Sequence, residues 1–509
     1  MKIDVVQNAK RNIIFGIVEK ADILIFPFIV RTVMIYTMGS LYVGLNGLFT
    51  SILSFLNISE LGIENAIIFC MYGSIANDDD STICKLLNYY KKLYHRVGLV
   101  ILIVGLLLIP FLPHLIKGDY PVGINIYVLY LVYLFNSFIS YWMFSYKGAL
   151  FAAFQRSDIS SKIMVIANTL CYISQIVVLL VSRNYYYYIV FLPVGTVLIN
   201  FMKQYYSKKF YPQFIPEGSI SHDMKQEIGK KIKALFGQKL SFFVLHASDS
   251  IVVSFYFGLE KVAQYENYYY ILNLLIALTG IVYTSINGGI GNKLEVQSDE
   301  INQKEFMSLT FFNSWLTMFC TVTLVCLYQT FMKLWVGPSL MFDNIMMSMF
   351  AMYFFVYQSY KITLVYKDSA GIWWEDRFRP YIVMGVNLAG NLILSYFIGI
   401  YGVILSTLLS MFISAPWATH TVLMYVFSNK EFGYYKKTVC YIIATLGLAV
   451  VSFYICGKMP LEGFAGLVVR ALFCLVVPNI CFAVMFAKTE EFSQLKYLIK
   501  RLRKRKTVI

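Results

Sequence analysis

The stretch ILIFPFIVRTVMIY, residues 23–36, places one arginine inside an otherwise apolar run. A guanidinium stays charged at every accessible pH, and placing one at membrane depth costs at least ~2.5–3.5 kcal/mol on insertion scales. Charged side chains in such positions usually face a helix bundle or a watery cavity. Arg31 is therefore the first candidate in this chain for contact with an anionic ligand.

The composition around this stretch is that of a membrane protein. Of 509 residues, 58% are hydrophobic and 14% are charged, whereas a soluble domain carries about 25% charged residues. The N-terminus runs into the first apolar segment without a small-residue cleavage site, so we expect no secretory signal. The nine cysteines and five histidines are scattered, without a CxxC. This pattern indicates neither a disulfide framework nor a metal site.

A transmembrane helix needs ~20 apolar residues, and the chain contains fourteen such segments. The sequence therefore predicts an all-α polytopic membrane protein with fourteen transmembrane helices. The predicted spans are residues 13–37, 42–73, 97–116, 122–146, 163–182, 186–202, 240–257, 264–290, 306–332, 342–360, 380–399, 401–427, 438–457 and 462–487.

The positions of Lys and Arg predict the orientation of these spans. With a cytoplasmic N-terminus, the inside segments hold 35 of the 43 Lys and Arg residues, and the outside loops hold five. This alternation is the positive-inside pattern, and an odd number of spans would destroy it. We therefore expect both termini in the cytoplasm, and most of the net charge of +15 reflects topology rather than nucleic-acid binding. Because the outside loops are short, no external domain can carry an active site, and we expect no enzyme.

The two halves of the chain resemble each other faintly. Three motifs recur in order at offsets of 214 to 219 residues: Gly39-x-x-x-Val43 as Gly258-x-x-x-Val262, Tyr146-Lys147-x-x-Leu150 as Tyr360-Lys361-x-x-Leu364, and Asn168 as Asn387. Six spans separate the matched positions, which indicates a parallel repeat. We expect two pseudo-symmetric six-helix lobes with alternating access, followed by two further helices. The predicted parts are a first lobe (1–208), a cytoplasmic linker (209–232), a second lobe (233–430), helices thirteen and fourteen (431–487) and a basic amphipathic cytoplasmic tail (488–509).

Several motifs together resemble one family. They include Arg31-Thr32, Tyr36-Thr37-Met38-Gly39, the stretch YVGLNGLF at 42–49, Asp249-Ser250-Ile251-Val252, Tyr265-Glu266-Asn267-Tyr268 and Lys367-Asp368-Ser369-Ala370-Gly371. This combination is similar to the Wzx-type polysaccharide flippases of bacteria, which belong to the multidrug/oligosaccharidyl-lipid/polysaccharide exporter (MOP) superfamily.

The resemblance implies a substrate and a location. The substrate would be an oligosaccharide repeat unit on undecaprenyl diphosphate, flipped to the outer leaflet of the bacterial cytoplasmic membrane for capsule, O-antigen or exopolysaccharide assembly. It implies no cofactor, and transport would be coupled to H⁺, Na⁺ or the membrane potential. A polymerase and a chain-length regulator of the same pathway would be partners, beside the membrane lipids.

Four cations are candidates for substrate binding. Arg31 suits a diphosphate because its planar fork binds phosphate bidentately, although a structural ion pair is the alternative. Lys20 lies eleven residues earlier, which places it within ~20° of Arg31 around the helix; a pair with Glu60 or Glu64 of the next helix is its favoured alternative. Lys147 and Lys361 occupy repeat-equivalent places at cytoplasmic helix ends, where ordinary snorkelling is equally expected.

Coupling or gating residues are expected in the seventh span and near Lys20. Asp249 lies nine residues before Gly258, as Arg31 lies eight before Gly39, so the repeat predicts opposite charges at nearly equal depth. His246, one turn away, could relay a proton. Glu60 and Glu64 complete this set. We expect Glu19 and Asp22 to be interfacial, and the cluster Glu375, Asp376, Arg377 and Arg379 to fix a loop through salt bridges.

Other functions remain open. A cation-coupled multidrug exporter and a lipid II flippase belong to the same superfamily and would share the span pattern. A membrane glycan polymerase or ligase is the alternative of another class, and it is disfavoured because it needs a large external loop. The sequence does not identify the sugars of the substrate or the coupling ion.

Overall fold

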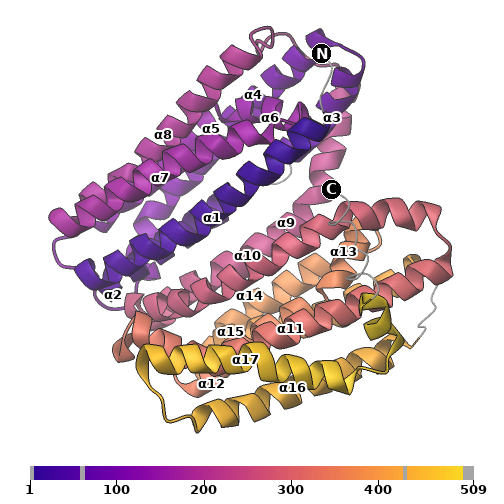
Figure 1. Cartoon of the computed structure of the whole chain (residues 1–509). Helices are drawn as coiled ribbons and strands as arrows, with labels where there is room; N and C mark the ends of the chain where they lie inside the picture. The colour runs from indigo at the N-terminus through magenta and orange to yellow at the C-terminus, as the bar shows by residue number, and fades with distance from the viewer. Residues whose placement is uncertain (1–4, 58–62, 428–432, 497–509) are drawn as a thin grey trace. The chain divides into compact units, whose positions relative to one another are not determined.

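The computed structural model describes residues 5–57, 63–427 and 433–496. In this part of the chain the regular structure is entirely helical, which confirms the predicted all-α class. The chain divides into two compact units, residues 1–263 and 264–509, and each is described by itself (Figure 1). Glu60 and the tail from residue 497 lie outside the described residues.

The helices of the first unit follow the predicted spans closely. The second predicted span is built from two shorter apolar helices, α2 and α3, and α4 continues into a 3₁₀ turn. The elements are α1 (Val5–Met38), α2 (Ser40–Leu56), α3 (Ile63–Ala76), α4 (Asp80–Leu108), η2 (Ile109–Leu115), α5 (Ile126–Trp142), η3 (Ser145–Lys147), α6 (Gly148–Ala153), α7 (Ser157–Val181), α8 (Tyr185–Phe210) and α9 (His222–Phe257).

The second unit contains one helix for each remaining predicted span and the short helix α13. Its first helix begins at the end of the first unit. The elements are α10 (Leu259–Val296), α11 (Asp299–Trp335), η4 (Pro338–Leu340), α12 (Asn344–Ser359), α13 (Lys361–Ser369), α14 (Arg379–Ile398), α15 (Tyr401–Tyr425), α16 (Tyr434–Gly457) and α17 (Gly463–Met485).

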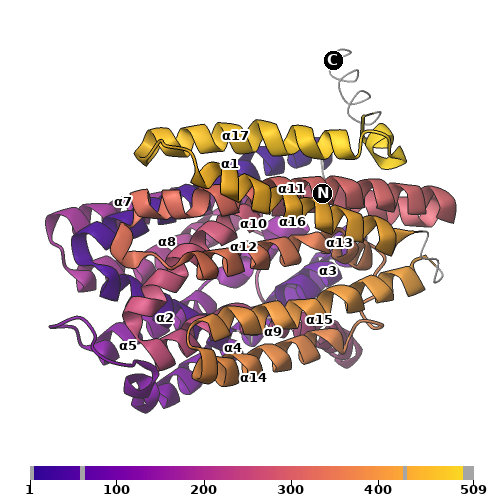
Figure 2. The ribbon, with the colours of Figure 1, turned by 90° about the horizontal axis from the view of Figure 1, so that it is seen from below.

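Many of these helices are suited to a bilayer. Among the described residues, eight are long and apolar enough to cross a membrane, and a ninth is obtained if the bent pair α5 and η3–α6 is one span. The outer surface fits the same solvent: α17 buries only 17% of its most apolar window, whereas α11 buries 61%. Figure 2 shows α17, α16 and α11 running alongside one another. The protein is thus a multi-pass membrane protein.

Side-chain caps set where several helices begin. Asp79, Asn125, Asn184, Ser221 and Asp343 each accept a backbone N–H of the first turn of the helix that follows. Such a cap stabilises a helix by ~1 kcal/mol. Because each cap follows a polar loop and precedes an apolar run, the sequence predicts these starts within a few residues.

The repeated glycines share one backbone conformation. Gly39 joins α1 to α2 with φ 94° and ψ 175°, and Gly258 joins α9 to α10 with φ 82° and ψ 176°. Both angles lie where an L side chain is strained. The matching conformation at matched positions supports the internal repeat.

The Tyr-Lys motifs also occupy equivalent places. Tyr146 and Lys147 lie in η3, where α5 breaks and α6 begins, and Tyr360 and Lys361 lie where α12 ends and α13 begins. In each half a long helix is thus followed by a bend and a short helix. The chain then enters an antiparallel pair, α7 with α8 and α14 with α15, whose members pack closely.

Candidate substrate and coupling site

Arg31 lies in the last third of α1, half-buried in the first unit. The neighbouring hydroxyl of Thr32 donates to the backbone oxygen of Phe28 at 2.7 Å, so it is satisfied within the helix. The guanidinium of Arg31 lies within electrostatic reach of the Tyr188 hydroxyl in α8. The charge at the centre of the opening stretch therefore faces a tyrosine-lined region of its own unit.

A cluster of tyrosines surrounds this position. Asn184 caps α8, and the helix then places Tyr185 and Tyr188 three residues apart on one face. Their rings stack at 5.4 Å, and the Tyr185 hydroxyl lies 3.2 Å from that of Tyr133 in α5. Tyr133 in turn donates to Asn46 of α2. These four side chains join α2, α5 and α8 through polar groups inside an apolar bundle.

Asp22 of α1 is a buried acid, and the interfacial position expected from the sequence is wrong. Its residue is 6% exposed, and Oδ1 accepts a hydrogen bond of 2.7 Å from the Thr169 hydroxyl of α7. Tyr172, one turn further along α7, lies within electrostatic reach of both Asp22 and Tyr188. Asp22, Tyr172, Tyr188 and Arg31 thus form a sequence of neighbouring polar groups, which we call the α1 polar cluster.

Sequence reasoning missed Asp22 because it counted distance from the cytoplasmic end of the span. The signal was present, since an acidic residue next to an apolar run is a functional candidate by default. Thr169 gave no signal, because a hydroxyl in a span commonly bonds to its own helix, as Thr32 does here.

Asp249 is also buried in the first unit. It is 4% exposed and lies between two buried serines of α9, Ser248 and Ser250. Helix α9 packs against α2, which also contacts α1. Arg31 and Asp249 therefore belong to helices that share a neighbour, and their pairing stays a prediction. The side chain of His246 lies outside the described residues.

Lys20 and Glu64 lie on exposed faces. Lys20 is on α1, and Glu64 is in the first turn of α3. An exposed position suits a cavity wall as well as the membrane surface, so the proposed cationic stripe of Lys20 and Arg31 stays a prediction.

The two repeated lysines have different surroundings. Lys147 is 5% exposed, and its Nζ donates to the backbone oxygen of Phe214 at 3.1 Å, which ties α6 to the chain beyond α8. Lys361 is half-buried, with Nζ 5.2 Å from the ring centre of Tyr357. The buried lysine has a structural contact, whereas the other presents its charge beside an aromatic face.

A salt-bridge network fixes the chain between α13 and α14. Asp376 is fully buried; its Oδ2 lies 3.0 Å from Lys367 Nζ and 2.6 Å from Arg379 Nη2. Arg379 Nη1 also donates to Ser414 of α15 at 2.7 Å. The loop-fixing role expected for Asp376 and Arg379 is confirmed, while Glu375 lies on the surface.

Electrostatics keep Asp376 ionised. Burial by itself would raise the pKa of its carboxyl, but the hydrogen bonds and positive charges of Arg379 and Lys367 outweigh burial and hold the pKa below 3.8. The first unit has a counterpart, because buried Asp158 accepts from Arg156 Nε at 2.8 Å and from Lys162 Nζ at 3.1 Å.

The interior of the second unit is polar but carries few charges. Asn313 accepts from the Tyr283 hydroxyl at 2.5 Å and donates to the backbone oxygen of Gln358 at 2.9 Å, and Gln358 contacts Thr279. Among the described residues of this unit, the buried ionisable side chains that form ion pairs are Lys367, Asp376, Arg379 and Glu491. Asp22 and Asp249, the acids that adjoin the candidate region, both lie in the first unit.

Solved structures share this fold. The lipid II flippase MurJ in an inward closed conformation is 14% identical over 93% of this chain and 99% of its own, with a TM-score of 0.67. An inward-facing multidrug resistance MATE transporter of the MOP superfamily is 12% identical over 79% of this chain and 94% of its own, with a TM-score of 0.62. This chain has the fold of the MOP transporters.

A further MOP transporter, from Pyrococcus furiosus, has a binding pocket described as reversed in polarity. It is 11% identical over 82% of this chain and 96% of its own, with a TM-score of 0.55. No protein-family model and no curated protein sequence matches the chain. At these identities the likeness establishes the fold, and it leaves the substrate to be argued from the residues.

Proposed function

We propose that this chain is a flippase for an oligosaccharide linked to a lipid diphosphate, moved from the cytoplasmic to the outer leaflet of the bacterial cytoplasmic membrane. The observation that carries this proposal is Arg31, a half-buried arginine on α1 beside Tyr188, in a chain with a transporter fold. A guanidinium is suited to a diphosphate, and tyrosine faces and hydroxyls are suited to sugars. The motifs that resemble Wzx-type flippases favour the same substrate.

The acids of the first unit suggest how transport is driven. Asp22 and Asp249 are buried carboxyls in helices close to Arg31. A carboxyl that binds H⁺ or Na⁺ when substrate leaves, and releases it when substrate binds, would couple the two. We assign Arg31 to the substrate diphosphate and Asp22 and Asp249 to the coupling ion, with both termini in the cytoplasm.

A lipid II flippase is the second candidate. The MurJ structure is matched over 93% of this chain, whereas the MATE transporter is matched over 79%. The two flippase substrates share the lipid diphosphate and differ in the sugars, so Arg31 serves either. A drug exporter would instead need a cavity for apolar cations, which a central arginine disfavours.

Transport into liposomes tests these candidates. Purified protein is reconstituted with a fluorescent undecaprenyl-diphosphate oligosaccharide, and a membrane-impermeant quencher reports the fraction that reaches the opposite leaflet. We expect faster flipping than in empty liposomes, and slower movement of lipid II and of a cationic dye. Equal rates with and without protein for the oligosaccharide lipid would overturn the proposal, and preferential flipping of lipid II would select the second candidate.

Variants locate the charge requirement. Arg31→Ala should lower the flipping rate at least ~10-fold, the equivalent of ~1.4 kcal/mol, and Arg31→Lys should recover part of it. Lys333→Ala is the control, because Lys333 is an exposed cation of the second unit, 3.6 Å from an exposed carboxylate. A fully active Arg31→Ala protein would remove Arg31 from the mechanism.

A further inference from the structure

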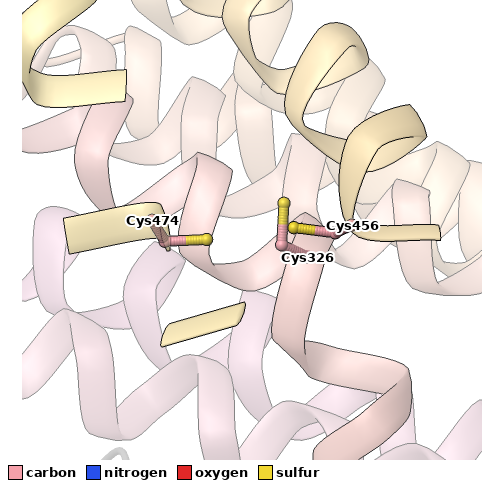
Figure 3. Close-up of side chains that lie close together, drawn as sticks. All are labelled: Cys326, Cys456 and Cys474. Atoms are coloured by element: carbon pink, nitrogen blue, oxygen red, sulfur yellow. The ribbon is translucent and has the colours of Figure 1, made fainter. Parts of the chain in front are cut away.

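Three cysteines from three helices meet inside the second unit. Cys326 lies on α11, Cys456 on α16 and Cys474 on α17, and their sulfur atoms all lie within 4.8 Å of one another. The side chains of Cys456 and Cys474 point toward each other, with Cys326 between them (Figure 3). All three residues are buried. The sequence gave no sign of this group, because its members are 130 and 18 residues apart.

The spacing of the sulfurs suits a single metal ion. Metal–thiolate bonds of ~2.3 Å would hold three sulfurs around a central ion ~4 Å apart. The observed group is already within 4.8 Å, so side-chain rotations of a few tenths of an ångström would close it. Among the described residues, no His, Asp, Glu or fourth Cys joins this group. The site therefore offers three soft ligands and no hard one.

The surroundings are apolar apart from one cation. The cluster packs in a core with Phe311, Met318 and Val322, which keeps the thiols away from water. The Arg470 guanidinium lies at its edge: Nε donates to the backbone oxygen of Cys456 at 3.1 Å, and Nη2 donates to that of Met459 at 3.3 Å. A nearby positive charge stabilises thiolates in such a dry site.

A glycine makes room for this arginine. A Cβ at Gly466, one helical turn before Arg470, would lie 2.8 Å from Arg470 Nη1 and 2.2 Å from the backbone oxygen of Leu461. Any side chain at residue 466 would displace the guanidinium. The local sequence thus permits a fixed cation beside the thiols.

We propose that Cys326, Cys456 and Cys474 form a binding site for one Cu(I) ion. Soft thiolates select Cu(I), and Zn²⁺ requires a fourth ligand that the group lacks. Binding releases two thiol protons to water, so that Cu⁺ with two thiolates and one thiol carries a charge of −1, which Arg470 balances. No electron is transferred. The site is independent of the flippase function, and Cys456, one residue before the end of α16, gives the ion a short path from that end of the bundle.

Competition for Cu(I) tests this site. Reduced full-length protein in detergent is titrated anaerobically with Cu(I) in the presence of a coloured Cu(I) chelator. We expect one equivalent to move from the chelator to the protein, and X-ray absorption to show sulfur ligands alone. Because loss of an outer-shell group alone costs 10–100-fold in metal affinity, replacing all three cysteines by serine should cost at least ~100-fold.

The same three helices supply a matched control. Cys320, Cys440 and Cys481 lie on α11, α16 and α17 and are outside the group; their triple serine variant should retain the equivalent of Cu(I). If the site variant does not fold, mass spectrometry of alkylated wild-type protein decides instead, and Cu(I) should protect the three site cysteines selectively. Equal Cu(I) affinity in both triple variants, unselective protection, or one equivalent of Zn²⁺ bound in preference would overturn the proposal and leave the cysteines as packing residues.

Discussion

Asp22 shows how a single residue in a span combines a stability cost with a function. Its buried carboxylate accepts a hydrogen bond from Thr169, so Asp22→Ala leaves that hydroxyl without its acceptor. We expect the free energy of unfolding to fall by about 1–3 kcal/mol, measured as loss of thermal stability in detergent. Glu19→Ala, in the same helix and less buried, is the control and should change it by no more than ~0.5 kcal/mol. Equal losses would show that Asp22 has no special contact.

The conservative change at this residue separates structure from coupling. Asp22→Asn keeps a hydrogen-bond acceptor for Thr169 but cannot ionise, so the protein should fold with near-normal stability. If Asp22 binds the coupling ion, flipping by this variant in proteoliposomes should no longer respond to an imposed H⁺ or Na⁺ gradient. An unchanged response to both gradients would leave Asp249 as the remaining candidate.

Asp376 carries a pH dependence whose sign follows from its surroundings. Because its folded-state pKa is held below 3.8, the network contributes stability that is complete above that value and is lost as pH falls through the folded-state pKa. Asp376→Ala leaves Lys367 and Arg379 buried together, and we expect a cost of about 3–5 kcal/mol at neutral pH. Thermal unfolding between pH 3 and pH 7 should show a smaller difference between wild type and variant at the acid end. A constant difference would contradict this account.

At the scale of the element, α2 and the start of α10 approach each other at a glycine. A Cβ at Gly44 would lie 2.0 Å from the backbone oxygen of Leu259, so Gly44→Ala must displace a helix and should destabilise the protein by about 1–3 kcal/mol. Gly16→Ala in α1 meets no atom within 4 Å and should be neutral or stabilising by up to ~1 kcal/mol, because alanine favours a helix. Thermal stability in detergent compares the two, and the opposite order would mean that the close approach is absent.

Helices were predictable from the sequence, whereas their buried faces were not. Apolar length and capping residues such as Asn184 determine where a span begins and ends, and both are local signals. In a membrane, lipid-facing and protein-facing side chains are equally apolar, so hydrophobicity cannot reveal which face of α1 packs on α7. For that reason the sequence identified Arg31 but misjudged Asp22, and it did not bring Cys326, Cys456 and Cys474 together. The repeat predicted the conformation shared by Gly39 and Gly258 because only glycine tolerates it.

At the scale of the whole molecule, charge alternation and helix count support each other. Each predicted span contains a helix of the structure, and the inside segments hold 35 of the 43 Lys and Arg. A lysine excess on one side opposes translocation of that loop, so the loops with few cations are expected outside. This reasoning gives a topology that can be measured without knowledge of the substrate.

Reporter fusions test that topology loop by loop. A reporter that is active only outside the cytoplasm should be active after residues 119, 183, 337 and 458, and inactive after residues 78, 217, 298 and 371. One that fluoresces only in the cytoplasm should give the reverse pattern. The decisive pair is 298 and 337, because α11 alone separates them and it is a well-buried span of 37 residues. The same reporter state at both would remove one span, reverse every later loop and contradict the fourteen-span topology.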